Sequence, residues 1–158
     1  MKPVDFIAAI KGAALECADK YRVPASVTIA QAALESSWGA NAPGHNLFGI
    51  KADASWKGPI TTFVTHEDVN GQRIQVTGKF RSYPDWLGSI DDHAYFLAAN
   101  PRYEVAFEHS DGPTFASAIA AAGYATDPAY AQKLHEIMQA HDLCALDQPS
   151  ANAAGGAV

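Results

Sequence analysis

A glutamate within an apolar stretch is the residue of this chain best suited to acid chemistry. Glu35 stands in the segment Ala-Leu-Glu-Ser-Ser-Trp-Gly, with Leu34 and Trp38 beside it. Apolar surroundings disfavour the charged form of a carboxyl group, so we expect the pKa of Glu35 to be raised. A carboxylic acid that keeps its proton can donate it to the leaving oxygen of a glycoside. The alternative is that Glu35 is a solvent-facing residue at a helix end.

Glycosidases generally use a second carboxylate, and two candidates precede a predicted hairpin turn. Glu67 and Asp68 come just before Asn70-Gly71. Adjacent residues of a strand point to opposite faces, so only one of these acids can face Glu35. The alternative is that both are solvated residues at a hairpin tip.

Aromatic residues are frequent in the same segments. Flat rings suit the C–H faces of sugars, so they could line a groove for a polysaccharide, or they could belong to the core. The residues concerned are Trp38, Phe48, Trp56, Tyr83, Trp86, Tyr124 and Tyr130.

The spacing of residues gives no support to other kinds of site. His135 and His141 lie six residues apart, which places them on different faces of a helix. The chain has no Cys-x-x-Cys pair, no phosphate-binding glycine loop and no Gly-x-Ser-x-Gly elbow. We therefore expect no metal ion and no organic cofactor. Cys17 and Cys144 are interpreted as small apolar residues, with a disulfide between them as the alternative.

Composition and charge exclude several classes of partner. The 158 residues carry a formal net charge of −6, with 11 lysines and arginines against 17 aspartates and glutamates. A face for nucleic acid is therefore not expected, because phosphate binding needs clustered cations. No run of about 18 apolar residues suits a membrane span. Charged residues also interrupt the start of the chain, so we expect synthesis in the cytoplasm without a signal peptide, and no membrane insertion.

The elements that must position these residues are mainly helices, predicted from apolar residues at three- and four-residue spacing. Ser26 is the expected N-cap of the second helix, and Gly39 its end. Asn70-Gly71 predicts a tight hairpin turn. The predicted helices are 3–22, 26–38, 84–99, 113–122 and 128–142, and the predicted strands are 60–66 and 72–80. We expect a single domain over 1–146, with a β-lobe at about 59–82, and a flexible tail over 147–158.

Several sequence blocks occur in an order that resembles glycoside hydrolase family 73, the peptidoglycan β-N-acetylglucosaminidases. The resemblance covers roughly residues 20–143. The blocks include Ala30–Gly39, Asn46–Lys51, Thr65–Glu67, Asn70-Gly71, Phe80–Tyr83, Asp92-His93 and Gly123–Pro128.

The resemblance implies an α+β, mainly α fold, in which a lysozyme-like helical body and a small two-stranded β-lobe form a substrate cleft. It implies that Glu35 is the general acid and Glu67 the second acid, and that Tyr124 lines the cleft near the reacting sugar. The family often has an aromatic residue after the second glutamate, where this chain has Asp68. The residues assigned to substrate binding are Asn46, Phe48, Trp38, Asp68 and Tyr130.

The activity implied by the resemblance is cleavage of peptidoglycan glycan strands at the β-1,4 bond between N-acetylglucosamine and N-acetylmuramic acid. Glu67 would orient water or stabilise developing charge, unless the acetamido group of the substrate is the nucleophile. The alternatives are a muramidase or lytic transglycosylase on the same fold, and a non-catalytic wall-binding or assembly module. We interpret the chain as bacteriolytic in the periplasm or cell wall of a target or host bacterium. It would be a phage lysin, or an interbacterial effector that requires a cognate immunity protein.

Overall fold

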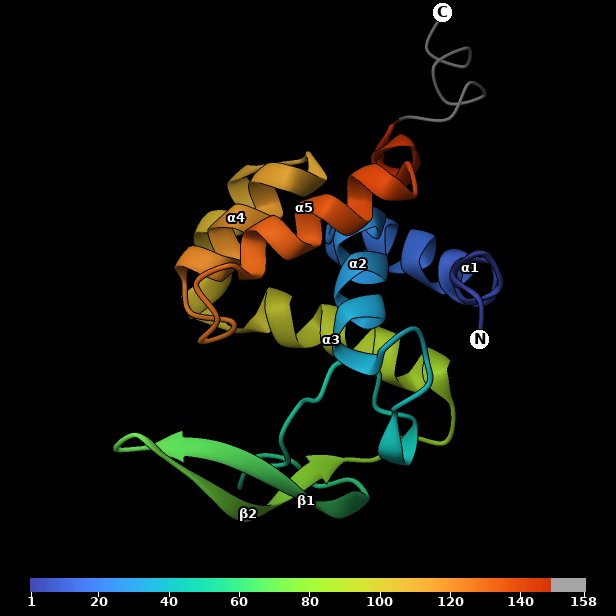
Figure 1. The fold of residues 1–158 in the computed structure, drawn as a ribbon. Helices are drawn as coiled ribbons and strands as arrows, with labels where there is room; N and C mark the ends of the chain where they lie inside the picture. The colour runs from blue at the N-terminus through green and yellow to red at the C-terminus, as the bar shows by residue number, and fades with distance from the viewer. Residues whose placement is uncertain (149–158) are drawn as a thin grey trace, which may run out of the picture.

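The computed structural model describes residues 1–148, which form a helical body from which one β-ribbon projects (Figure 1). The fold is mainly helical with one two-stranded antiparallel sheet, as predicted. No described helix is long and apolar enough to cross a membrane. Of the expected tail, residues 149–158 lie outside the described residues. The elements are α1 (Pro3–Tyr21), α2 (Ala25–Ser36), η1 (Pro43–His45), β1 (Ile60–Val69), β2 (Gln72–Arg81), α3 (Trp86–Ala99), η2 (Pro101–Glu108), α4 (Gly112–Ala121), α5 (Tyr130–Ala140) and η3 (Leu143–Asp147), where η denotes a 3₁₀ helix.

α2 crosses the middle of the helical body (Figure 1). Every residue from Ala25 through Ala33 is buried, and most of them are small. Small side chains let α1, α4 and α5 pack closely against this helix. α2 ends at Ser36, two residues before the expected position, because Ser37 and Trp38 adopt left-handed backbone angles (φ 50° and 58°). Glu35 therefore lies in the last turn of α2.

The N-terminus of α2 is held by a residue from the far end of the described chain. The expectation that Ser26 is the N-cap is wrong, because α2 begins one residue earlier and Ser26 lies in its first turn. The Asp147 carboxylate accepts hydrogen bonds from the Ser26 backbone N–H (3.1 Å) and hydroxyl (2.5 Å). It thus satisfies a first-turn N–H group that has no partner within the helix. Asp147, expected in the tail, belongs to η3 and to the helical body.

The core lies between α2 and the helices around it, and Cys17 is one of its buried residues. Cys144 is partly buried, and both thiols are free, so the disulfide considered as an alternative is not formed. Burial raises the pKa of the Cys17 thiol to about 11. The cysteines are therefore small apolar residues of the packing.

β1 and β2 form the predicted hairpin, with Asn70-Gly71 at its turn. Both turn residues have positive φ (52° and 78°), as a type I′ turn requires. Alternate residues of β1 are half-buried, among them Phe63 and Thr65, while their neighbours on the strand are exposed. Phe63 stacks on Phe80 of β2, with ring centroids 4.1 Å apart. One face of the ribbon is thus turned toward the body.

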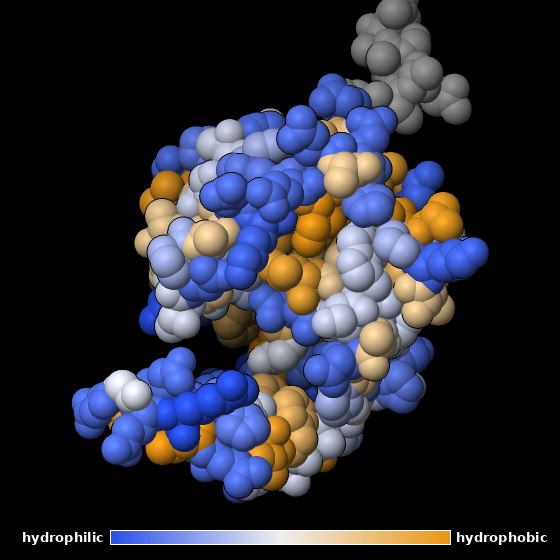
Figure 2. Space-filling model, in the orientation of Figure 1, coloured by the Kyte–Doolittle hydropathy of each residue, from blue (hydrophilic) through white to orange (hydrophobic). Residues whose placement is uncertain are grey.

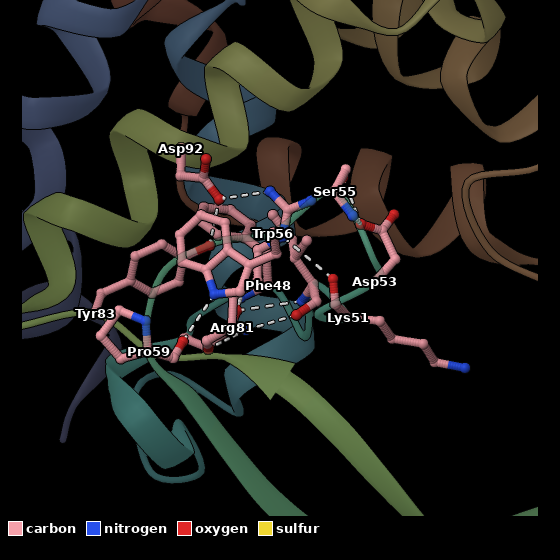
Figure 3. Close-up of polar contacts among 11 residues, drawn as sticks. Phe48, Lys51, Asp53, Ser55, Trp56, Pro59, Arg81, Tyr83 and Asp92 are labelled. Carbon is pink, nitrogen blue, oxygen red and sulfur yellow. Dashed lines mark hydrogen bonds and ion pairs between the residues drawn. The ribbon is translucent and has the colours of Figure 1, made fainter.

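A nearly buried ion pair joins the base of the ribbon to α3 (Figure 3). Arg81 at the end of β2 donates to Oδ2 of Asp92 at 3.0 Å, and the Tyr83 hydroxyl donates to the same oxygen at 2.5 Å. The guanidinium also lies 4.8 Å from the ring centroid of Trp56, and its Nε donates to the Lys51 carbonyl. Loss of one partner would leave a poorly solvated charge, so this contact fixes the base of the ribbon to the body.

Candidate active site

Three adjoining hollows share one lining residue, Glu35, and the first two of them lie between the helical body and the β-ribbon. Their volumes are about 600, 260 and 290 Å³. The second of them lies against the ribbon, where Phe63 and Thr65 line it, and the third lies beside α5. The molecule is visibly hollowed between ribbon and body (Figure 2). We call the three hollows together the cleft.

Glu35 lies in the wall of the cleft, in the last turn of α2. Its side chain is exposed on the side of the cleft, while protein atoms surround it on the others. This partial removal from water raises the pKa of Glu35 above its ordinary value of 4.5. Hydrogen bonding from the Tyr130 hydroxyl lowers the pKa, but this effect is the smaller one. Glu35 is thus biased toward the protonated form that an acid catalyst needs.

A buried row of polar side chains, Gln31, Tyr130 and His93, lies behind Glu35. Gln31 precedes Glu35 by one turn of α2, and its Nε2 donates to the Tyr130 hydroxyl at 2.8 Å. Its Oε1 lies 2.9 Å from Nε2 of His93 on α3. Gln31 and His93 are fully buried, and Tyr130 is 3% exposed. Desolvation lowers the pKa of His93 to about 3, so its ring is neutral near neutral pH.

Tyr124 lines the cleft from the segment that follows α4. Gly123, with φ at 88°, provides the left-handed residue after α4 that turns the chain toward the cleft. The Tyr124 ring stacks on Tyr130, with centroids 5.6 Å apart. Burial raises the pKa of the Tyr124 hydroxyl, so it is a neutral hydrogen-bonding group. The structure therefore brings Glu35, Tyr124 and Tyr130 to one wall.

The loop after α2 forms another part of the cleft, and Asn46 determines its shape. The Asn46 amide donates to the carbonyls of Ile50 (3.0 Å) and Arg81 (2.9 Å). Its oxygen accepts from the backbone N–H groups of Phe48 and Ile50, at 3.2 and 3.3 Å. These four bonds occupy the whole side chain, so Asn46 shapes the loop rather than offering a free polar group to a substrate. Phe48 lines the cleft and stacks on His93, with ring centroids 3.8 Å apart.

The two acids before the hairpin turn face opposite sides of the ribbon. Glu67 shares the face of Phe63 and Thr65, which line the cleft. Its Oε1 lies 3.9 Å from Nζ of Lys51, another cleft residue. Asp68 lies on the outer face, opposite Arg73 in the register. Of the two acids, Glu67 is turned toward the cleft, although it lies farther out along β1 than Thr65.

Trp38, expected to bind substrate, packs on the body away from the cleft. Its ring meets Phe6 and His141 edge-on, with centroids 5.9 and 4.9 Å apart. It lines none of the three hollows around Glu35. The left-handed backbone after Ser36 ends the helix before Trp38, which the prediction placed within the helix 26–38.

Several residues of the site do not emerge from sequence reasoning. No local sequence pattern connects Gln31 with His93, because they are 62 residues apart along the chain. The one local signal is a polar glutamine within an otherwise apolar helix. Among residues 1–148, no cluster of histidine, cysteine, aspartate or glutamate is arranged to hold a metal ion. Further cleft residues that sequence reasoning misses as site residues are Lys51, Asp53, Arg81, Phe96, Arg102 and Tyr103.

Comparison with known sequences finds one protein family across most of the chain. A family model described as mannosyl-glycoprotein endo-beta-N-acetylglucosaminidase matches residues 11–143. The peptidoglycan hydrolase FlgJ of Salmonella typhimurium is 41% identical over 142 residues, which cover 85% of this chain and 45% of FlgJ. The exo-glucosaminidase LytG of Bacillus subtilis is 38% identical over 151 residues, covering 90% of this chain and 53% of LytG. The chain spans about half the length of these relatives.

Solved structures agree with the fold. A glycoside hydrolase domain of Salmonella typhimurium FlgJ superimposes with a TM-score of 0.76 at 39% identity, covering 89% of this chain and 98% of that domain. The catalytic domain of the autolysin Auto from Listeria monocytogenes gives 0.79 at 31% identity, covering 91% and 86%. These likenesses confirm the predicted fold class of a helical body with a small β-lobe.

Proposed function

Because this chain belongs to the glucosaminidase family, glycoside hydrolase family 73, we propose that its cleft binds and hydrolyses peptidoglycan glycan strands. The bond cut is the β-1,4 bond on the reducing side of N-acetylglucosamine, which joins it to the next N-acetylmuramic acid. The observation that carries this proposal is Glu35, whose pKa is raised and whose carboxyl is exposed in the wall of the cleft. Tyr124 on the same wall offers a ring for stacking and a neutral hydroxyl.

In the proposed reaction, Glu35 gives its proton to the glycosidic oxygen as the bond from that oxygen to the sugar C1 breaks. Positive charge develops on the sugar ring, and the oxygen of a water molecule then forms the new bond to C1. The proton lost by that water restores Glu35, directly or through a second base. Hydrolysis thereby leaves N-acetylglucosamine at the new reducing end.

We assign the second carboxylate to Glu67, which is turned toward the cleft beside Lys51. It would orient the attacking water or stabilise the developing charge. If the acetamido group of the substrate forms the first bond to C1, Glu67 serves mainly to hold the substrate. Because Glu67 lies out along the ribbon, closure of the ribbon over the substrate would bring it nearer to Glu35.

The test is hydrolysis of purified peptidoglycan by the wild type and by Glu35→Gln, which keeps the size of the side chain and removes the transferable proton. We expect the rate to fall by about 100- to 10,000-fold, the usual contribution of a general acid. Glu16→Gln, an exposed change on α1, is the matched control. Wild-type rates in Glu35→Gln would refute the assignment.

Mass spectrometry of the products distinguishes the three cleavage types. N-acetylglucosamine at the new reducing end supports the proposal, while N-acetylmuramic acid there indicates a muramidase. An anhydro product indicates a lytic transglycosylase. Binding without any shortening of the strands would indicate a wall-binding module.

We further propose that the chain is bacteriolytic, because cutting glycan strands damages a cell wall. Delivery of the chain to the periplasm of a test bacterium should cause lysis that Glu35→Gln does not cause. Suppression of that lysis by a tightly bound protein from the producing cell would favour an effector with an immunity partner over a phage lysin.

A further inference from the structure

In the row behind Glu35, His93 donates to Gln31 and Gln31 donates to Tyr130. Oε1 of Gln31 can only accept, so Nε2 of His93, 2.9 Å away, carries the ring proton. The ring is neutral, so Nδ1 carries none, and within the described residues this buried atom has no hydrogen-bond partner. The amide N–H of Gln31 in turn donates to the Tyr130 oxygen at 2.8 Å.

The single hydroxyl proton of Tyr130 is left free by this arrangement. A phenol oxygen that accepts from Gln31 donates its own hydrogen to another group. Glu35 stands one turn after Gln31 on the same face of α2, and it lines the same hollow as Tyr130. The acceptor that this geometry offers to the Tyr130 proton is therefore the Glu35 carboxyl, whose charged form such a hydrogen bond would favour.

We propose that Gln31 and His93 are positioning residues that direct the Tyr130 hydroxyl proton to Glu35. The hydrogen bond from His93 fixes the orientation of the Gln31 amide. Because the Gln31 N–H then donates to the Tyr130 oxygen, the Tyr130 hydroxyl proton is directed to the Glu35 carboxyl. A hydrogen bond to the carboxylate favours its charged form, so the row sets the pH at which Glu35 loses its catalytic proton. The catalytic meaning of this inference rests on the proposed function, whereas the hydrogen bonding does not.

The row itself carries no charge near neutral pH, which makes it testable without altering local charge. The charged groups that face Glu35 stay in place in the variants below. Lys133 of α5 pairs at 2.5 Å with Asp127, which lies just before that helix. Across the cleft are Lys51, Asp53, Arg81 and Arg102.

The test is the pKa of Glu35 itself, followed by carboxyl-carbon NMR titration of glutamate-labelled protein and assigned with Glu35→Gln. Tyr130→Phe removes the proton donor and should raise the Glu35 pKa by about one unit, because hydrogen bonds to charged groups are the stronger ones. Gln31→Met keeps the volume and adds no charge, and it should raise the pKa in the same direction. The double variant should give no larger rise than Tyr130→Phe alone.

Gln132→Met is the matched control, because it makes the same substitution at an exposed glutamine of α5 that bonds to Glu136. It should leave the Glu35 pKa unchanged. An unchanged pKa in Gln31→Met, or shifts that add fully in the double variant, would overturn the inference. If Gln31→Met does not fold, Gln31→Leu replaces it. This uncharged side chain also lacks an N–H donor for Tyr130, so the Glu35 pKa should rise, and no rise would equally overturn the inference.

The role of His93 is tested with two variants, one without an N–H donor and one that keeps an N–H donor. His93→Leu should raise the Glu35 pKa, and His93→Gln, which keeps an N–H donor, should restore it in part. Equal values in the two variants would remove His93 from the proposal. In active variants the alkaline limb of the kcat/KM profile should move to higher pH by the same amount as the NMR pKa. A wild type without activity would refute the proposed function, while the titration would still decide the role of the row.

Discussion

The side chains around Glu35, the general acid of the proposed reaction, differ in their exposure. Glu35 meets the cleft directly, whereas Gln31 and His93 lie behind it and are fully buried. All the hydrogen-bonding positions of the Asn46 amide are occupied by backbone groups, so Asn46 contributes to the shape of the cleft. The proposed acid and the residues proposed to position it are thus different side chains, which can be altered one at a time.

At the same scale, the ribbon acids give a paired prediction. Glu67→Gln should lose roughly tenfold or more in the rate of peptidoglycan hydrolysis, because Glu67 is turned toward the cleft. Asp68→Asn should retain nearly the full rate, because Asp68 lies on the outer face of the ribbon. The same assay measures both variants. Damage confined to Asp68→Asn would contradict the assignment, and little damage in either variant would favour the acetamido-assisted route.

Among the elements, the β-ribbon is the one with least support from the core. An isolated two-stranded hairpin is marginally stable, and this one is fixed at its base by Arg81, Asp92 and Tyr83 (Figure 3). Most residues on both sides of its turn are exposed. A ribbon held at one end can move as a unit about that end, which suits closure over a long polymer.

Hydrogen exchange tests this view of the ribbon. Amides of residues 60–81 should exchange faster than those of α2 and α3, and Arg81→Met should speed exchange in the ribbon further while the helices stay protected. The reason is that the substitution leaves Asp92 poorly solvated and without its partner. Lys79→Met, an exposed change on the same strand, is the control. Equal protection of ribbon and helices would instead indicate a rigid, preformed cleft.

For the whole molecule, the buried histidine links stability to pH. The pKa of His93 is about 3 in the folded state and 6.5 when exposed, so between these values the unfolded state binds a proton that the folded state does not. The free energy of unfolding should therefore be fully retained above pH 6.5 and fall on acidification toward pH 3. The loss is on the order of a few kcal/mol. Glu35, with its raised pKa, opposes this trend more weakly.

Urea unfolding at several pH values measures this dependence. His93→Gln should show a flatter decline in stability between pH 6.5 and 4 than the wild type, whatever the stability of this variant at neutral pH. His66→Gln, at an exposed position of β1, should decline as the wild type does. An identical decline in His93→Gln would mean that the ring is protonated in the fold or that its burial has no energetic effect.

Features that depend on neighbours along the chain could be predicted from the amino-acid sequence. The Asn70-Gly71 hairpin follows from the positive φ that both residues tolerate, and the helices follow from apolar periodicity. Glu35 could be selected because it lies next to Leu34 in a predominantly apolar helix. The alternation of side chains along a strand already indicated that Glu67 and Asp68 would face opposite sides.

Contacts between residues far apart in the chain became known from the folded structure alone. Asp147 holds Ser26 across 121 positions, and His93 reaches Gln31 across 62. Such contacts depend on how α2, α3 and η3 pack, and no local pattern encodes that packing. Trp38 shows the same limit, because the left-handed backbone after Ser36 places its ring against Phe6 and His141 instead of in the expected substrate-binding site. Periodicity assumes that a helix continues, whereas packing of the whole chain determines where it ends.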